Sequence, residues 1–306
     1  MSSSLVGSEM CIRDSVYAID WSASSRPSPK KPSPDSIFIA QKDFENTIYH
    51  PKYFRTRMSA YEYLRGQLKD NIAQGKRQLV GFDFSFGFPT GFLSNLVGAQ
   101  NTRFLWKWFF DEILDDHENS NNRFLVADKI NSRCNGVGPF WGCPVNLKLP
   151  NLPAKGTECK EHDFPKFRLC EQFTAAQPVW KLYTTGAVGS QTLLGLPYLH
   201  RLAVEFGKEI AFWPFDNEAL LANNKIVVCE IYPSMFFNSH AQKKLINLYP
   251  DQQYKIKDAS QVQVMADVLL HSPKMPWFEA YLDDSNYSEK IREEGWIFGQ
   301  IMEGGL

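Results

Sequence analysis

Short apolar runs bounded by polar residues, Gly or Pro recur along the chain, and each is typical of a buried strand. The runs that predict strands are residues 16–20, 37–40, 47–54, 78–83 and 226–231. Between the third and fourth runs, apolar side chains recur at helical spacing and predict a helix from Ser59 to about Ala73. This order of three strands, a helix and further strands predicts an α/β fold with a mixed five-stranded sheet.

The stretch from 91 to about 224 interrupts this regular order. It contains a strongly aromatic helix, expected over residues 104–117, and an edge strand, expected within residues 210–215. No flexible linker of the kind that separates domains bounds this stretch. We therefore expect a single domain over residues 16–306, with a large insertion at about 91–224 between the fourth and fifth core strands.

A second core helix is predicted to begin at Asp258. The apolar residues of its buried stripe are Val262, Met265, Ala266 and Leu269. Asp258 lies on the same stripe one turn earlier, whereas Asp267 falls about half a turn away, at about 100° per residue, and should point elsewhere. After this helix, residues 293–299 predict a final short strand.

The first 15 residues show neither helical nor strand periodicity, and they lack the basic start and long apolar core of a signal peptide. They resemble translated read-through of a sequencing adapter, so we expect residues 1–15 to be foreign to the folded protein. The natural protein is then expected to begin just before Val16. The alternative is a natural disordered N-terminus.

Composition limits the classes of protein that fit. Charged residues make up 22% and hydrophobic residues 43% of the chain, which is ordinary for a globular protein. The formal net charge of -1 provides no global basic field for nucleic acid, so such binding needs a local patch. The 6 scattered cysteines favour a reducing cytoplasm. No apolar run approaches the about 20 residues that span a bilayer.

Four acidic residues stand where a lone carboxylate is unfavourable. Asp20 and Asp83 end predicted buried strands, Glu230 lies near the end of another, and Asp258 begins a helix. Because a desolvated carboxylate is costly unless it is paired or binds a metal, we expect these four side chains to meet. Carboxylate oxygens suit Mg²⁺ or Mn²⁺, and two such ions about 4 Å apart support phosphodiester hydrolysis. The four acids are therefore candidate metal ligands and catalytic residues.

Structural alternatives exist for the same acids. The acid that ends the first strand can accept hydrogen bonds from turn amides. Asp258 fits a helix N-cap, with Gln261 as its reciprocal partner. Glu230 can form an ion pair with Lys225 or Arg201.

A Gly-rich stretch before a predicted helix is a candidate phosphate-binding loop. Backbone amides at a helix N-terminus favour anions, Ser190 and Gln191 can add hydrogen bonds, and Gly189 permits close approach. The alternative is a plain entry into the helix with Ser190 as its N-cap. Ser22 and Lys257, each within two residues of one of the acids, are further candidate substrate-binding residues.

Zinc is the alternative metal. Its candidate ligands are Cys134, Cys143, Cys159, His162 and Cys170, but their spacing is uneven, whereas structural zinc sites show a tight pair on each side. We therefore expect these thiols to be buried or incidental.

Several short motifs occur in a fixed order along the chain. They are residues 18–23, 81–84 with 87–89, 187–191, 213–215, 230–234 and 258–259. In this order they resemble the domain of unknown function 429 family, which is described as a predicted nuclease with a ribonuclease H-like fold. The resemblance covers nearly all of the chain from Val16 onward. It implies a ribonuclease H-like sheet, with metal ligands at the ends of the first and fourth strands, here Asp20 and Asp83.

The combined expectation is a cytoplasmic, metal-dependent phosphodiester hydrolase of the nuclease type, with Mg²⁺ or Mn²⁺ as cofactor. Its expected partner is a nucleic acid or nucleotide substrate, and the net charge of -1 favours a small nucleotide or a short single strand over a long duplex. One alternative is an actin-like phosphotransferase, which needs two copies of this fold where the sequence predicts one. The other is a non-catalytic binding protein on the same fold.

Overall fold

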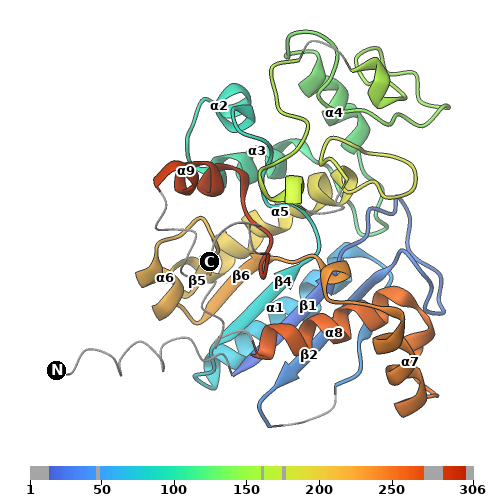
Figure 1. Cartoon of the computed structure of the whole chain (residues 1–306), viewed down its shortest axis with the longest axis vertical. Helices are drawn as coiled ribbons and strands as arrows, with labels where there is room; N and C mark the ends of the chain where they lie inside the picture. The colour runs from blue at the N-terminus through green and yellow to red at the C-terminus, as the bar shows by residue number, and fades with distance from the viewer. Residues whose placement is uncertain (1–13, 46–48, 160–161, 174–176, 272–284, 301–306) are drawn as a thin grey trace.

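A six-stranded mixed sheet organises the computed structural model, which describes residues 14–45, 49–159, 162–173, 177–271 and 285–300 (Figure 1). The strands are β1 (Ser15–Asp20), β2 (Ile37–Asp43), β3 (Lys52–Phe54), β4 (Gln78–Phe82), β5 (Ile210–Phe212) and β6 (Ile226–Glu230). Their order across the sheet is β3-β2-β1-β4-β6-β5, with β1, β2 and β3 antiparallel and β1, β4, β6 and β5 parallel. The α/β class is confirmed, but the count of five strands is wrong, because β5 adds an edge strand.

Helices pack on both sides of this sheet. They are α1 (Arg57–Ala73), α2 (Phe92–Val97), α3 (Thr102–Glu112), α4 (Arg123–Asn131), α5 (Gly189–Phe206), α6 (Glu218–Asn223), α7 (Ser239–Leu248), α8 (Lys257–His271) and α9 (Ser285–Glu294). Helices α2 to α5 lie above the sheet in the view of Figure 1, whereas α8 crosses in front of β1 and β2. No helix in the described ranges is long and apolar enough to cross a membrane.

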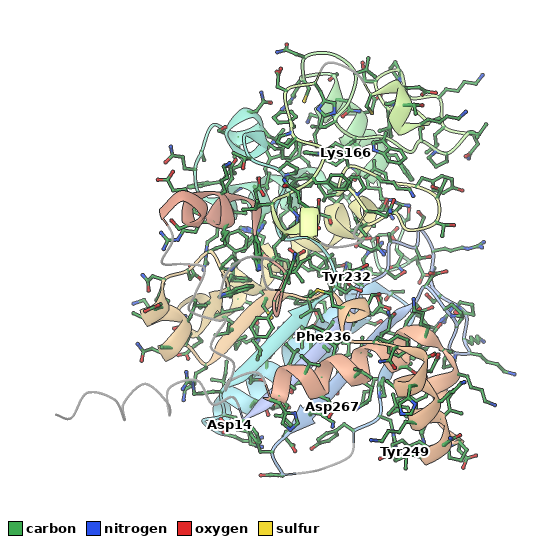
Figure 2. All side chains as sticks on the ribbon, in the orientation of Figure 1. Asp14, Lys166, Tyr232, Phe236, Tyr249 and Asp267 are labelled. Atoms are coloured by element: carbon green, nitrogen blue, oxygen red, sulfur yellow. The ribbon has the colours of Figure 1, made fainter. Side chains whose placement is uncertain are left out.

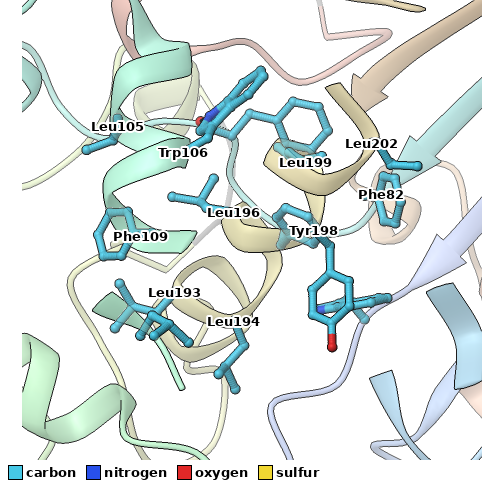
Figure 3. Packing of buried hydrophobic residues seen from close by; sticks show 14 of the residues in the cluster. Phe82, Leu105, Trp106, Phe109, Leu193, Leu194, Leu196, Tyr198, Leu199 and Leu202 are labelled. Atoms are coloured by element: carbon cyan, nitrogen blue, oxygen red, sulfur yellow. The ribbon is translucent and has the colours of Figure 1, made fainter. Parts of the chain in front are cut away.

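Alternate side chains of β1 enter two hydrophobic clusters, one on each face of the sheet. Tyr17 and Ile19 join a cluster that includes α1, α3 and α5, whereas Val16 and Ala18 join a cluster that includes α8. Figure 3 shows leucines of α5 packed with aromatic side chains of α3 and with Phe82 of β4. Because both faces are covered, the parallel strands are continuous apolar runs, which is the pattern that made them predictable.

Two boundaries near the N-terminus differ from the predictions. Ser15, which the sequence assigns to the foreign segment, is the first residue of β1 and pairs with Asp43. Residues 1–13 lie outside the described residues. Helix α1 begins at Arg57 rather than Ser59, because Thr56 is the N-cap and its side chain accepts a hydrogen bond from the Ser59 amide.

The predicted C-terminal strand is largely absent. Residues up to Glu294 belong to α9, where Glu, Lys and Arg favour a helix. Gly295 follows with φ of 79°, in the left-handed region that ends helices. One isolated parallel bridge, between Glu230 and Ile297, is formed within the predicted range.

Candidate active site at the carboxyl ends of the parallel strands

Asp20 and Asp83 lie beside each other where two neighbouring parallel strands end. Asp20 is the last residue of β1, and Asp83 directly follows β4. Ile19 pairs with Phe82, and the Asp83 amide donates to the Ile19 carbonyl oxygen at 2.9 Å. This register sets the two acids opposite each other, so their side chains leave the same face of the sheet. The fold thus brings together the two acids that the strand pattern had singled out.

Neither carboxylate of the pair forms an ion pair with a cation in the described part of the chain. Burial, followed by the charges of Glu230 and Asp258, raises the pKa of Asp83 to about 7. Burial, followed by Asp83 and Asp258, raises the pKa of Asp20 well above its ordinary value. Within the described residues, no hydrogen bond or ion pair reaches either carboxylate, and both side chains are partly exposed to solvent. Acids with raised pKa values that are still accessible to solvent are typical of functional sites.

Asp258 approaches from the start of α8, which covers the same face of the sheet. Helix α8 begins at Lys257, so Asp258 is its second residue rather than its N-cap. Its Oδ2 accepts a hydrogen bond from the Asp35 amide at 2.8 Å. Gln261, the expected capping partner, donates to the Ser234 hydroxyl instead. The N-cap interpretation is therefore wrong, and Asp258 stays a candidate ligand.

Asp35 is an acid of this site that the sequence analysis missed. Its charge contributes to the raised pKa values of Asp20 and Asp258, which burial raises first. Its φ of 58° lies in the left-handed region, which Asp tolerates better than most residues. The Ser22 hydroxyl donates to the Asp35 carbonyl oxygen at 2.7 Å and accepts from the Ser24 amide. Ser22 thus holds the loop that carries Asp35, and we no longer assign it to substrate binding.

Lys257 and Tyr232 complete the polar surroundings of the acids. The side chain of Lys257 is exposed, and its charge opposes the rise in the pKa values of Asp20, Asp83 and Asp258. Tyr232, labelled in Figure 2, follows β6. Burial and then the charge of Asp83 raise the pKa of Tyr232, which places its ring near that acid. Lys257 remains a candidate contact for an anionic substrate.

Glu230 is held away from the other acids by an arginine. It pairs in register with Phe82, one residue before Asp83, so its side chain leaves the opposite face of the sheet. Both of its oxygens are engaged by Arg168, at 2.8 Å and 2.5 Å, and the Phe86 amide donates to Oε2 at 3.0 Å. The ion-pair interpretation of Glu230 therefore holds, but with a partner other than the two cations considered from the sequence. Both oxygens of its carboxylate are therefore engaged by hydrogen bonds within the protein.

This ion pair belongs to a network that fixes the loop after Asp83. Arg168 also donates to Glu171 at 2.9 Å, and the Phe86 carbonyl oxygen accepts from the Trp106 ring nitrogen at 2.8 Å. Both backbone groups of Phe86, its amide and its carbonyl oxygen, thus hold the loop in place. Arg168 lies in a stretch without helical or strand periodicity, so the sequence offered no signal for its role.

The candidate phosphate loop packs against protein instead of facing an open site. The Gly189 amide donates to the Lys181 carbonyl oxygen at 2.9 Å, and a side chain at Gly189 would collide with neighbouring backbone. Ser190 is the second residue of α5 rather than its N-cap, and its buried hydroxyl accepts from Arg123 at 2.9 Å. The Oε1 atom of Gln191 is buried without a hydrogen-bond partner among the described residues. Gly189 and Ser190 therefore support the fold, and we no longer assign these three residues to phosphate binding.

Within the described ranges, the cysteines are not grouped as zinc ligands. Cys159 and His162 both approach Gly138, where an added Cβ would lie 3.2 Å from each side chain. Cys143 donates instead to the Leu147 carbonyl oxygen at 3.1 Å. All the cysteines in the described ranges are free thiols.

No group of three or more His, Cys, Asp or Glu side chains in the described part of the chain is close enough to hold a metal ion. A preformed cage of the four predicted acids is therefore absent there, and Asp20 and Asp83 remain as a carboxylate pair.

Comparisons with protein-family profiles, with curated proteins and with solved structures give no match. The fold and the site thus define the class: an α/β protein with unpaired acids at the ends of its central parallel strands.

Proposed function

We propose that this protein is a metal-dependent phosphodiester hydrolase on a ribonuclease H-like fold, of the type described for the domain of unknown function 429 family. The observation that carries the proposal is the pair of uncompensated carboxylates, Asp20 and Asp83, at the ends of adjacent parallel strands. The sheet order supports the fold assignment, because three antiparallel strands come first and parallel strands are added through helices. In this assignment β5 is an additional edge strand.

The donor set fits a hard divalent cation. Mg²⁺ is commonly held by one or two carboxylates together with waters and substrate phosphates, so Asp20 and Asp83 suffice without a third protein ligand. Their raised pKa values reflect crowded negative charge, which a cation would offset. Asp258 and Asp35 add negative charge around the pair. Mg²⁺ and Mn²⁺ are therefore the cofactors that we propose.

In the proposed site, some side chains bind the metal or the substrate, and others hold the binding residues in position. A divalent cation bound at Asp20 and Asp83 would lower the pKa of a bound water and offset charge on the phosphate. Glu230, paired with Arg168, holds the loop that presents Asp83 and is a positioning residue rather than a ligand. Lys257 is exposed beside the acids, where its cation can contact a substrate phosphate.

A small or single-stranded substrate suits the charge of the protein. The net charge of -1 offers no broad basic surface of the kind that grips a long duplex. We therefore propose a nucleotide or a short single strand as the substrate. The actin-like alternative needs two copies of the fold, whereas the described residues form one six-stranded sheet.

Hydrolysis of bis(p-nitrophenyl) phosphate and of a short single-stranded oligonucleotide tests this function. Activity should require Mn²⁺ or Mg²⁺, and Asp20→Asn and Asp83→Asn should each reduce the rate at least a hundredfold. Asp70→Asn, which changes an exposed carboxylate on α1, is the matched control and should leave the rate unchanged. A folded protein without metal-dependent cleavage of either substrate would favour the non-catalytic binding protein.

A further inference from the structure

Arg123, at the start of α4, is a buried cation without an opposing charge. Its side chain is part of a residue that is only 7% exposed. Its guanidinium donates to three neutral oxygens, those of Ser190 at 2.9 Å, Ser25 at 2.8 Å and Asn121 at 2.7 Å. None of the ion pairs in the described residues includes it. Its guanidinium carbon also lies 4.3 Å from the centroid of the Phe124 ring, and this cation–π contact offsets part of the cost of burial. The buried charge still has no carboxylate partner of its own.

The nearest acid is already committed to a different arginine. Asp115 accepts hydrogen bonds from Arg57 at 2.7 Å and 2.5 Å, and from the Tyr198 hydroxyl at 3.0 Å. One carboxylate therefore serves two buried arginines and leaves an excess positive charge. Burial, followed by the charge of Arg57, lowers the pKa of Arg123 to about 10.

The guanidinium of Arg123 is open on one side. Its Nη2 donates to no residue in the described part of the chain, and it is not among the buried polar atoms that lack a partner, so it reaches solvent. Ser25, which accepts from Nη1, is exposed. The solvent-reaching Nη2 of Arg123 and the exposed hydroxyl of Ser25 are therefore the groups that can meet an anion.

Two short connections join this position to the acids. Ser25 belongs to the loop that directly follows Asp20 at the end of β1. Thr192, in the first turn of α5 like Ser190, accepts a hydrogen bond from the Ser85 amide, in the loop that directly follows Asp83. Arg123 thus contacts the loop after Asp20 directly and is linked to the loop after Asp83 through the first turn of α5.

We propose that Arg123 binds a second phosphate group of the substrate, away from the phosphodiester that the acids cleave. The planar guanidinium suits a phosphate, because its donors match phosphate oxygens better than a lysine does. The inference rests on the proposed function and narrows its substrate to a molecule that carries at least one phosphate in addition to the scissile phosphodiester, such as a short phosphorylated strand.

Calorimetric titration of the metal-free protein with inorganic phosphate tests this subsite, with chloride at matched ionic strength as the background. The unchanged protein should bind phosphate saturably, and Arg123→Met should weaken this binding at least tenfold. Arg133→Met, which removes an exposed arginine after the same helix, should bind like the unchanged protein. Absence of saturable binding, or equal binding by Arg123→Met, would overturn the proposal.

A second variant covers the case in which Arg123→Met does not fold. Ser25→Glu introduces a carboxylate at the exposed contact of Arg123, so it should raise the melting temperature and abolish phosphate binding. Phosphate binding that survives this change would refute the subsite. Because no metal or turnover enters either titration, phosphate binding without hydrolysis would uphold the subsite and reject the hydrolase. Hydrolysis together with phosphate binding that does not depend on Arg123 would uphold the hydrolase and reject the subsite.

Discussion

Replacing Asp83 by Asn should stabilise the metal-free protein, and the size of the gain should depend on pH. Burial and the neighbouring acids raise the pKa of Asp83 from 3.8 to about 7. At about 1.4 kcal/mol per pKa unit, keeping this group ionised in the folded state at pH 8 costs about 4 kcal/mol as an upper value. Asparagine has nearly the same shape and carries no charge, so it removes that cost.

The sign of the pH dependence follows from the raised pKa. The folded protein holds the Asp83 proton more tightly than the unfolded chain does, so folding is favoured while the group is protonated. The destabilisation is absent below about pH 4, grows as the pH rises toward 7, and is complete above it. The advantage of Asp83→Asn should therefore fall from about 4 kcal/mol at pH 8 to under about 2 kcal/mol at pH 5.

Urea denaturation in EDTA at pH 5 and pH 8 measures both values. Asp70→Asn is the control and should show no pH-dependent gain, because its carboxylate is exposed. Added Mn²⁺ should stabilise the unchanged protein at pH 8 more than Asp83→Asn, since the cation offsets the same charge. A variant that is less stable than the unchanged protein, or a gain that does not vary with pH, would show that ionised Asp83 does not destabilise the fold.

Three further predictions concern the residues that support the site. Arg168→Met should lower the free energy of unfolding by about 3–5 kcal/mol in urea denaturation, because it leaves Glu230 buried and unpaired; an unchanged free energy would contradict this. Adding Glu230→Gln to that variant should recover part of the loss, and strictly additive losses would argue against direct pairing. Gly189→Ala should cost about 1–3 kcal/mol and lower the melting temperature, because the new Cβ would lie 2.2 Å from the Val179 carbonyl oxygen; an unaltered melting temperature would show that the helix start can shift freely.

Where the pattern of apolar residues determines the structure, the sequence predicted it well. The runs that end at Asp20 and Asp83 became neighbouring parallel strands, because both are covered on two faces and are apolar throughout. The apolar stripe of α8 likewise indicated which face of that helix packs on the sheet. Asp258 lies on the same stripe, so its position near the other acids could also be predicted. Asp267, which lies half a turn away and is labelled in Figure 2, pairs instead with Lys42.

The remaining features depend on contacts that periodicity does not encode. An offset of one residue in register turns Glu230 to the other face, and only the strand pairing reveals it. Its partner Arg168 comes from an irregular segment, and Asp35 reaches the site through a loop. Gly189 resembled a glycine that lets a ligand approach the backbone. In the structure it instead lets protein backbone pack closely. Because glycine serves both purposes, the sequence alone does not distinguish them.

A metal site at Asp20 and Asp83 can be measured by calorimetric titration of the full chain with Mn²⁺ at pH 8. Saturable binding is expected, which Asp83→Asn abolishes and Asp70→Asn leaves intact. No saturable binding by the folded protein, or equal binding by Asp83→Asn, would contradict a metal site at the ends of β1 and β4.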